Sequence, residues 1–319
     1  MKESSHAIAP AFKKLPNLPV ANKVWLLRML SLLASASRLF FRWSERVIAT
    51  EHAIPVRDAG EVKVIEVTPK SLIGVAPAIV YYHGGGFFMS YGGLHLKKVE
   101  AYAEQLRVRL FFVEYRLSTQ QPFPGALMDC VSALDWVHDN AESLQVDRDR
   151  VAVMGDSAGG CLAASVAQLV CDENEQRQQP KPIRAQFLIY PVLDCDCKTP
   201  SARSFHDTPV WNTRNNQVMW QVYLPGIQDD VQALPPAYAS PAHRHDFRGL
   251  PSAYIESAEY DPLRDEAHAY ADALTAAGVH VVRLMVKGAV HAYDFVDCEI
   301  SRSAENERLT VMRELLCDE

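Results

Sequence analysis

Short apolar segments alternate with amphipathic segments of helical period along most of the chain. Residues 61–67 and 76–83 are the first of these strands, and residues 46–56 are an antiparallel partner for 61–67. Continuous apolar runs are typical of strands that are buried on both faces. The alternation predicts an α/β fold with a mostly parallel sheet of about eight strands and helices on both faces. Further strands are expected at 109–115, 150–155, 184–191, 251–258 and 280–286, with helices near 95–106, 126–141, 158–171, 263–277 and 302–316.

The composition argues against a nucleic-acid-binding protein and against a secreted disulfide-rich protein. The chain has 319 residues, 48% of them hydrophobic, and a formal net charge of −7. One large domain with a buried core is expected, and no run of Lys or Arg offers a surface for nucleic acid. The seven cysteines are odd in number and scattered, unlike a secreted disulfide framework. With a polar start that does not resemble a signal peptide, these features predict a cytoplasmic protein.

Residues 24–41 could pack on the protein or lie on a membrane. Arg28 and Arg38 interrupt the segment, so no apolar run approaches the length that spans a bilayer. We expect the segment to pack on the body of the same protein, and a helix lying on a membrane surface is the less favoured alternative. The apolar stripe at helical spacing consists of Leu26, Met29, Leu30, Leu33, Phe40 and Phe41.

A strand, a tight turn and an Ala-rich helix are expected within residues 151–170 (VAVMGDSAGGCLAASVAQLV). A helix that begins at Ala158 directs its free N–H groups and its positive dipole end at Ser157. Gly155 and Gly159 leave room for a strained turn. The pattern predicts a nucleophile at Ser157, and a plain glycine-rich turn is the alternative until partners are found.

Three glycines, Gly84, Gly85 and Gly86, follow the buried strand at 76–83. Without side chains, their backbone can approach a ligand closely and turn its N–H groups into one concavity. One such N–H, together with that of Ala158, would make an oxyanion hole. A phosphate cradle is the weaker alternative, because no Gly-Lys-Ser or Gly-Lys-Thr follows and the glycines lack G-x-G-x-x-G spacing.

The candidate acid is Asp261 and the candidate base is His291. Asp261 follows a strand end, and the proline after it keeps it out of helical conformation. A helix N-cap is the alternative role for Asp261, and Asp265 is expected to serve the dipole of the next helix. His291 lies on the loop after the last strand, downstream of both Ser157 and Asp261, and the order Ser, Asp, His is one that a strand-turn-helix nucleophile of this kind uses.

Two other groups contain metal-ligating residue types. Cys195-Asp-Cys197 lacks a second pair at zinc-site spacing. His243-Arg-His245 has no apparent third ligand. We therefore predict neither a metal nor a cofactor.

Four motifs together resemble the hormone-sensitive-lipase family of α/β-hydrolases, in its bacterial carboxylesterase branch. They are HGGGF at 83–87, GDSAGG at 155–160, LIYP at 188–191 and DPLRDE at 261–266. The resemblance covers about residues 46–319. It implies Ser157, Asp261 and His291 as the catalytic triad. It also implies an oxyanion hole from Ala158 and the glycine loop, with Gly85 and Gly86 preferred as donors over Gly84.

Residues 198–225 break the alternation of strands and helices. They are expected to form a loop and a helix that starts near Asn212 or Thr213. In the family, such an insertion and the N-terminal helices form a cap over the site; an ordinary surface excursion is the alternative. The resemblance therefore implies cap helices in 1–45, a catalytic domain of 46–197 and 226–319, and a cap insertion at 198–225. Pocket depth would depend on cap residues such as Phe205, Trp211 and Trp220.

The chain departs from the family pattern in two places, which leaves substrate preference open. Ser118, Thr119 and Gln120 stand where relatives usually have Ala-Pro-Glu, and Ala292 and Tyr293 stand where relatives often have Gly-Phe. The expected function is a serine carboxylesterase for small short-acyl esters. The alternatives are lactonase, amidase or longer-chain lipase activity, or a non-catalytic ligand-binding module. No nucleic-acid partner and no membrane association are expected, and a homodimer is the oligomer that the resemblance implies.

Overall fold

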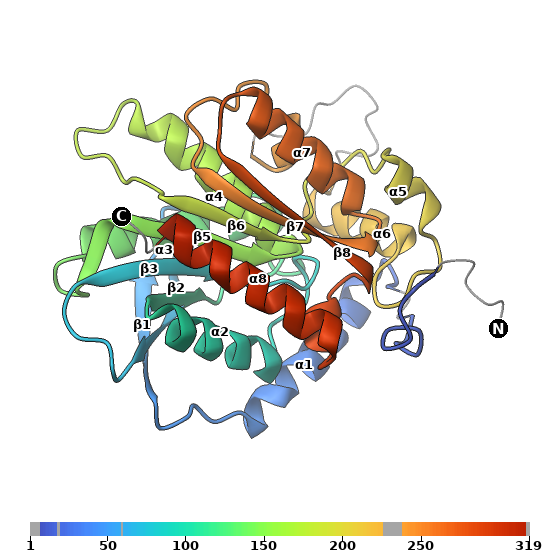
Figure 1. The fold of residues 1–319 in the computed structure, drawn as a ribbon, viewed down its shortest axis with the longest axis horizontal. Helices are drawn as coiled ribbons and strands as arrows, with labels where there is room; N and C mark the ends of the chain where they lie inside the picture. Colours follow the sequence, from blue (N-terminus) through green and yellow to red (C-terminus); the bar gives the residue numbers. More distant parts are fainter. Residues whose placement is uncertain (1–6, 18–19, 59, 226–237, 317–319) are drawn as a thin grey trace.

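The computed structural model describes residues 7–17, 20–58, 60–225 and 238–316. These residues form an eight-stranded sheet in the order β1-β2-β4-β3-β5-β6-β7-β8 (Figure 1). The α/β prediction is therefore confirmed. The strands are β1 (Val47–Pro55), β2 (Glu61–Pro69), β3 (Ala76–Tyr82), β4 (Arg109–Val113), β5 (Val146–Asp156), β6 (Ala185–Ile189), β7 (Ser252–Tyr260) and β8 (Val281–Val290).

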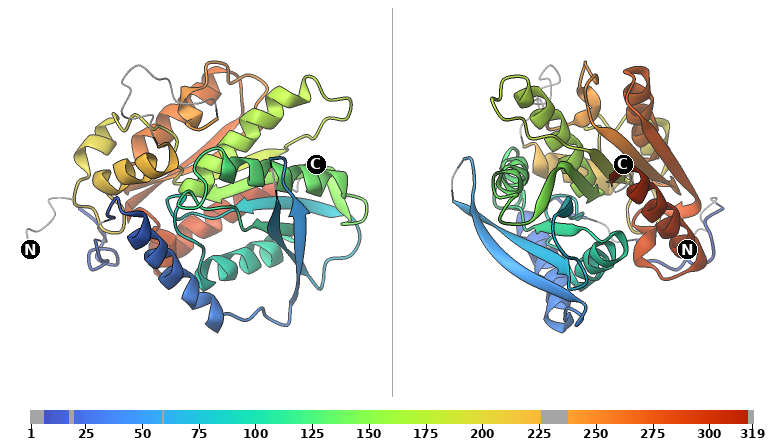
Figure 2. Two further views of the ribbon diagram at one scale, coloured as in Figure 1. Left: turned by 180° about the vertical axis from the view of Figure 1, so that it is seen from behind. Right: turned by 60° about the vertical axis from the view of Figure 1, so that its left-hand side comes forward.

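Only the first part of the sheet is antiparallel. β1 pairs with β2 from Val47 opposite Pro69 to Pro55 opposite Glu61, and β2 pairs with β4 in the same sense. From β4 to β8 every pair is parallel. Buried and more accessible residues alternate along most of β2, whereas β3 and β6 are buried along their whole length. The apolar runs at β3 and β6 therefore mark the covered centre of the sheet, and Figure 2 shows β1 and β2 at one end.

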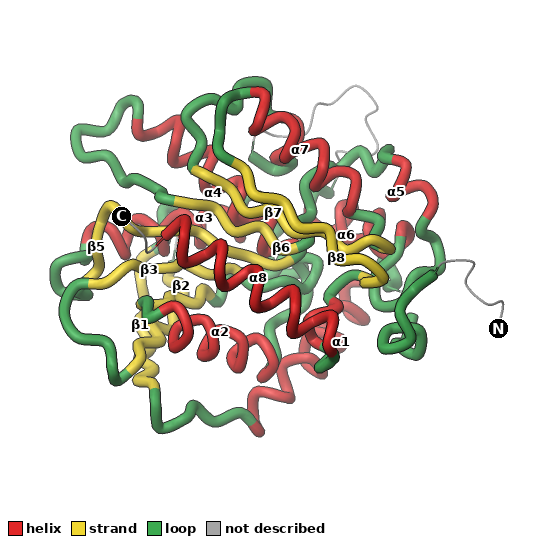
Figure 3. The backbone as a smooth tube through the Cα atoms, in the orientation of Figure 1, coloured by secondary structure: helices red, strands yellow, loops and turns green. Residues whose placement is uncertain are grey.

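Helices cover both faces of the sheet (Figure 3). α2 and α8 pack on one face, and α3, α4 and α7 pack on the other, so the sheet separates two apolar cores. This arrangement leaves the carboxyl ends of the central strands open to loops, which is where ligand sites lie in such folds. The helices are α1 (Val24–Ala36), α2 (Gly93–Leu106), α3 (Gly125–Asp139), α4 (Ala158–Asn174), α5 (Pro200–Ser204), α6 (Thr213–Tyr223), α7 (Arg264–Ala276) and α8 (Glu299–Leu316), with short 3-10 turns η1 (Ser37–Phe40), η2 (Pro241–His243) and η3 (Tyr293–Phe295).

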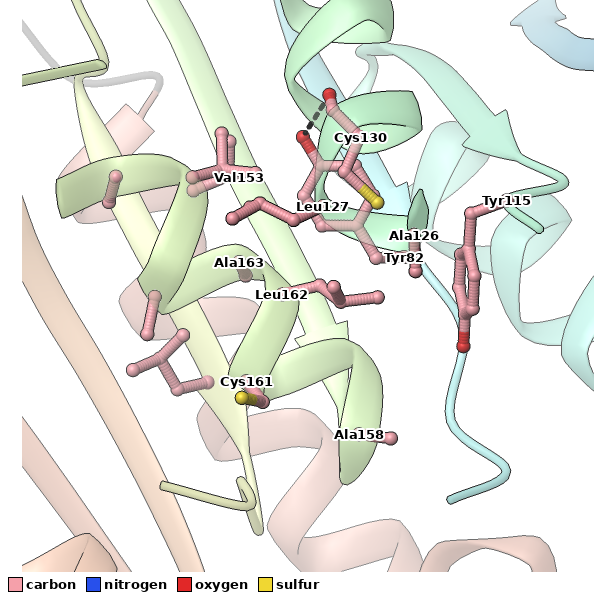
Figure 4. Close-up of a cluster of buried hydrophobic side chains, with 14 of the residues drawn as sticks. Tyr82, Tyr115, Ala126, Leu127, Cys130, Val153, Ala158, Cys161, Leu162 and Ala163 are labelled. Carbon is pink, nitrogen blue, oxygen red and sulfur yellow. Dashed lines mark hydrogen bonds between the residues drawn. The ribbon is translucent and has the colours of Figure 1, made fainter. Parts of the chain in front are cut away.

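The core between α3 and α4 supports the turn after β5 (Figure 4). The first turns of α4 carry small or slender side chains, including Ala158, Cys161 and Ala163, all buried. Tyr82 spans the space toward α3, where its hydroxyl donates to the carbonyl oxygen of Cys130 at 3.2 Å. Close packing of this kind resists small displacements, so the residues at the start of α4 are held firmly.

The stripe predicted for residues 24–41 is wrong about the buried face. In α1, the buried residues are Leu27 and Ser31, whereas Met29 is 50% exposed and Leu33 68%, and Phe40 in η1 is 87% exposed. Hydrogen bonds fix this orientation, because Ser31 Oγ accepts from the backbone N–H of Ser90 at 2.9 Å. Within the described residues, none of the helices combines the length and apolarity that crossing a bilayer requires.

The segment 198–225 contains the expected helix, α6, and the short helix α5, which was not predicted. Asn212 caps α6 by accepting from the N–H of Asn215 at 3.1 Å. The N-terminal segment packs against α6, because Asn215 Oδ1 also accepts from the N–H of Val20 at 2.9 Å and Asn22 Nδ2 donates to Gln221 Oε1 at 2.8 Å. Residues 1–6 and 226–237, which the predicted domain boundaries include, lie outside the described residues.

Candidate active site

Ser157 lies on a sharp turn between β5 and α4 at the centre of the sheet. Its φ of 55° and ψ of −118° are unusual for a residue with a side chain. Neighbouring segments hold this conformation: the Ser157 N–H donates to Ile189 O at 2.9 Å, and the N–H of Val192 donates to Ser157 O at 3.1 Å. Gly159 is required as well, because a Cβ there would overlap the carbonyl oxygen of Tyr82. The turn presents the serine side chain at the carboxyl ends of the strands.

His291 connects Ser157 to Asp261. Its Nε2 lies 2.9 Å from Ser157 Oγ, and its Nδ1 lies 2.6 Å from Asp261 Oδ2. All three side chains are buried. The other carboxylate oxygen of Asp261 accepts from the N–H of Leu263 at 3.0 Å, so Asp261 also orders the turn before α7. The geometry is that of a hydroxyl with an adjacent base and an acid that orients the base.

The glycine loop approaches this serine, but its first N–H is already used. Gly84 donates to Asp156 Oδ1 at 3.0 Å. The expectation that Gly84 could also serve as an oxyanion donor is therefore corrected, because that bond directs its hydrogen at the carboxylate. Gly85 and Gly86 have φ values of 123° and 58°, which glycine adopts readily. Their N–H groups and that of Ala158 are the remaining candidates.

Asp156 is a structural residue that the sequence analysis did not single out, although it precedes the serine. Tyr81 donates to the same oxygen, Oδ1, at 2.5 Å. Burial raises the pKa of Asp156, while the bond from Tyr81 opposes that shift. One carboxylate therefore ties the glycine loop to the turn that carries Ser157.

His83, directly before the glycines, has a structural role too. Burial is the main reason that its pKa is lowered to about 3, so the ring is neutral at ordinary pH. Nδ1 hydrogen-bonds Gly84 O at 2.6 Å, and the ring stacks on that of Tyr115 with centroids 4.3 Å apart. Tyr115 also donates to the carbonyl oxygen of His83 at 2.6 Å. These contacts fix the entry to the glycine loop.

A buried ionic group lies behind His291. Tyr190 packs edge-on against His291, with centroids 4.9 Å apart, and its hydroxyl donates to Asp294 Oδ1 at 2.6 Å. Lys98 Nζ lies 2.5 Å from Asp294 Oδ2. Burial opposes ionisation of Asp294, but Lys98 and Arg308 hold the pKa of its carboxyl well below the usual range. Asp294 follows Ala292 and Tyr293, the positions where the chain departs from the family pattern.

The two acidic residues after Asp261 connect α7 to other segments. Asp265 is in the first turn of α7, as expected, and it also accepts from the N–H of Ser201 in α5 at 2.7 Å. Glu266 is buried and accepts from the N–H of Leu193 at 2.7 Å. Burial raises the pKa of Glu266 well above its usual range.

Two metal-type groups that are far apart in the sequence meet in the structure. One ligating atom each from Cys195, Asp196 and His243 lies within 4.8 Å of the others. His243 Nε2 already bonds Asp194 Oδ1 at 2.9 Å, and Asp196 pairs with Lys198 at 3.0 Å. Because protein groups occupy these side chains, we do not assign a metal to them, and the absence of a metal stays a prediction.

The chain is similar to known α/β-hydrolases whose names describe ester hydrolysis. A family model described as alpha/beta hydrolase fold matches residues 79–295. The carboxylesterase NlhH of Mycobacterium tuberculosis is 38% identical over 219 residues, which are 68% of this chain and 66% of the relative. The ethyl acetate hydrolase of Pseudomonas putida is 33% identical over 216 residues, 68% of this chain and 65% of the relative. The matches thus span slightly less than two thirds of either relative. The solved structure of a bacterial heroin esterase is 33% identical, with a TM-score of 0.88 over 98% of this chain and 99% of that chain.

Proposed function

The chain belongs to the α/β-hydrolase fold family, as its motifs indicated, and on that premise we propose that it is a serine carboxylesterase for small, short-chain acyl esters. One observation carries the proposal: His291 is hydrogen-bonded to both Ser157 and Asp261 at the carboxyl ends of the strands. The names of the similar proteins support ester hydrolysis, and one of them is named for ethyl acetate, a short-chain ester.

The reaction follows from the positions of these groups. His291 Nε2 accepts the Ser157 proton as Oγ attacks the ester carbonyl carbon, and Asp261 stabilises the imidazolium that forms. The N–H groups of Gly85, Gly86 and Ala158 donate to the oxyanion; losing one such donor typically costs about 10²–10³ in kcat. His291 then protonates the leaving alcohol. Water, deprotonated by His291, attacks the acyl-enzyme and releases the acid.

The N-terminal segment and the cysteines support two further proposals, one about a cap and one about cellular location. We propose that residues 1–45 and 198–225 together form the cap, because Val20 and Asn22 bind α6. We also propose a cytoplasmic location, which is supported by six cysteines that are free thiols in the described part of the chain.

Hydrolysis of p-nitrophenyl esters from acetate to laurate tests the activity. We expect turnover on acetate and butyrate, a decline with longer chains, and labelling of Ser157 by a fluorophosphonate, located by peptide mass spectrometry. Folded protein with no turnover on any ester and no label would leave the ligand-binding module as the better assignment. Faster turnover on laurate than on butyrate would favour the lipase alternative, and a preference for lactone or amide substrates would favour those classes.

Trp211 forms a wall of the proposed acyl pocket. Its ring centroid lies 5.9 Å from that of His291, and its Cη2 lies 3.0 Å from where a Cβ on Gly86 would be. The other two cap aromatics named in the sequence analysis lie elsewhere. Phe205 packs edge-on against Tyr260, and Trp220 packs against Phe87. Only Trp211 of the three is thus in ring contact with the triad.

Trp211→Ala is expected to shift the preference toward longer acyl chains. We expect kcat/KM for octanoate, relative to acetate, to rise about tenfold or more, since a hydrophobic pocket distinguishes one methylene by about 10–200-fold. Phe205→Ala is the matched control, because Phe205 and Trp211 are both 6% exposed. If the octanoate-to-acetate ratio is unchanged in Trp211→Ala, or rises equally in Phe205→Ala, Trp211 does not line the acyl pocket.

A further inference from the structure

The outward side of α1 and η1 is an exposed apolar surface. We call it the α1 patch, and exposure of its members ranges from 46% to 87%. Monomeric proteins rarely leave contiguous apolar patches of this kind in water, and such patches mark interaction sites. The patch holds seven of the twelve large hydrophobic side chains that are exposed in the described part of the chain. Its members are Val24, Trp25, Met29, Leu32, Leu33, Leu39 and Phe40.

The patch residues of α1 lie on the side of the helix that faces away from the protein. Trp25, Met29 and Leu32 follow one another at spacings of four and three, which places them on one face of a helix. The opposite face carries Leu27 and Ser31, the two buried residues of α1. In the left view of Figure 2, α1 runs along the outer surface of the molecule. The helix is therefore held by one side and presents an apolar face with no partner among the described residues.

The charge of this region is opposite to that of the protein. Residues 4–44 contain no Asp or Glu, although the whole chain has a net charge of −7. The Arg38 guanidinium lies 4.3 Å above the ring of Tyr91, and the other five cationic residues are exposed. Six cationic residues lie in the segment: Lys13, Lys14, Lys23, Arg28, Arg38 and Arg42. Four of the six, Lys23, Arg28, Arg38 and Arg42, lie in α1 and η1 or directly beside them. Cations beside an apolar face with Trp and Phe are typical of helices that lie in a membrane interface.

A hollow of about 840 Å³ adjoins the patch. Leu32 and Leu39 of the patch form part of its wall, and Arg38 and Arg42 add positive charge. Tyr91 and Leu96, which are buried, also line it. Glu51 and Glu114 also line the hollow, and Lys63 pairs with both of them. Arg38 and Arg42 therefore remain as the cations that adjoin its apolar wall on the side of the patch.

We propose that the α1 patch docks on the surface of a bilayer that contains anionic lipids. The apolar side chains enter the interface, and the Lys and Arg side chains extend to the headgroups. A second copy of the chain fits less well. A two-fold dimer through this patch would bring the same cationic segment of each copy together, and like charges across an interface oppose association.

The α1 patch lies next to the proposed cap. Asn22, just before α1, binds Gln221 in α6 at 2.8 Å. Tyr223, at the end of α6, stacks on Phe87 of the glycine loop with centroids 3.8 Å apart. A protein bound through the α1 patch would therefore hold its cap close to esters dissolved in the bilayer.

Flotation with lipid vesicles tests the docking without using the enzymatic activity. We expect wild-type protein to float with phosphatidylglycerol vesicles and to stay at the bottom with phosphatidylcholine vesicles. Leu33→Gln/Phe40→Gln should weaken binding at least tenfold. Ile73→Gln/Val75→Gln is the matched control, because these exposed side chains, 91% and 64%, lie between β2 and β3, away from the patch. The thermal midpoint confirms that each variant is folded.

A second variant tests the charge. Lys23→Gln/Arg42→Gln, at two exposed residues directly before α1 and shortly after η1, should reduce flotation with phosphatidylglycerol, and added salt should weaken the wild-type binding in the same way. Three results would overturn the proposal: wild type that floats with neither vesicle, equal flotation with both, or equal binding by the patch and control variants. A concentration-dependent dimer that disappears in Leu33→Gln/Phe40→Gln would assign the patch to self-association instead.

Discussion

Ser157→Ala is expected to lower kcat for p-nitrophenyl acetate by about a millionfold, the size of loss seen when the nucleophile of a comparable triad is removed. His291→Ala should cost about as much, because without its base the hydroxyl is not deprotonated. Since the two residues act as one unit through a 2.9 Å hydrogen bond, the double variant should be no slower than either single variant. Steady-state rates per mole of folded protein, with the folded fraction checked by circular dichroism, measure these effects.

Ser165→Ala is the control for this series. Ser165 is also a buried serine of the β5–α4 region, but it lies two turns along α4 from the triad. We expect wild-type rates from it. Residual activity of Ser157→Ala within tenfold of wild type would exclude Ser157 as the nucleophile. Losses that multiply in the double variant would show that Ser157 and His291 act independently.

The centre of the site could be predicted because it depends on local pattern and on topology. A strand, a glycine-rich turn and a helix place Ser157, and parallel strands bring the loops after β7 and β8 to the same edge of the sheet. Asp261 and His291 follow those two strands, so residues 104 and 134 positions beyond Ser157 could be selected from their place in the alternation. The structure brings all three into hydrogen-bonding contact.

The orientation of α1 could not be predicted in the same way. Helical spacing finds apolar positions, but the buried face depends on the surface that the helix meets. That surface is the loop before α2 and the first residue of α2, where the N–H groups of Ser90 and Gly93 bind Ser31 of α1 and Ser37 of η1. Leu27 and these two serines, rather than the predicted stripe, therefore face the protein. A serine facing a loop gives no periodic signal in a sequence.

The ionic group behind His291 also depends on distant pairs. Tyr190 and Asp294 are 104 positions apart, and Arg308 and Tyr102 are 206 apart. No local motif links such residues. The sequence contained one indication of this group. Asp294 directly follows Ala292 and Tyr293, where the chain departs from the family pattern. The departure suggested a change in the pocket, whereas the structure places Asp294 in a network that packs behind His291 through Tyr190.

Arg308→Met is expected to lower the free energy of unfolding by about 3–5 kcal/mol, the range for breaking a buried ion pair from one side. Arg308 in α8 is 1% exposed. Its guanidinium bonds both carboxylate oxygens of Glu256, at 2.6 and 2.9 Å, and lies 3.1 Å from Asp294. Removing the cation leaves two buried carboxylates with one fewer partner each, a loss that the added apolar contacts of methionine cannot offset. Urea unfolding followed by circular dichroism measures the change.

Arg302→Met in the same helix shows whether burial is the cause. Arg302 pairs with Asp297 at 2.5 Å, but the two side chains are 63% and 86% exposed, and exposed pairs contribute only about 0–1 kcal/mol. Glu256→Gln combined with Arg308→Met should recover part of the loss, since the buried charge is then removed from both sides. Equal destabilisation by Arg302→Met and Arg308→Met would show that burial does not increase the contribution of the Arg308 pair to the free energy of unfolding. A loss confined to Arg308→Met would assign the stabilisation to the buried ion pair, which reaches the tyrosine behind His291 because Asp294 contacts both Arg308 and Tyr190.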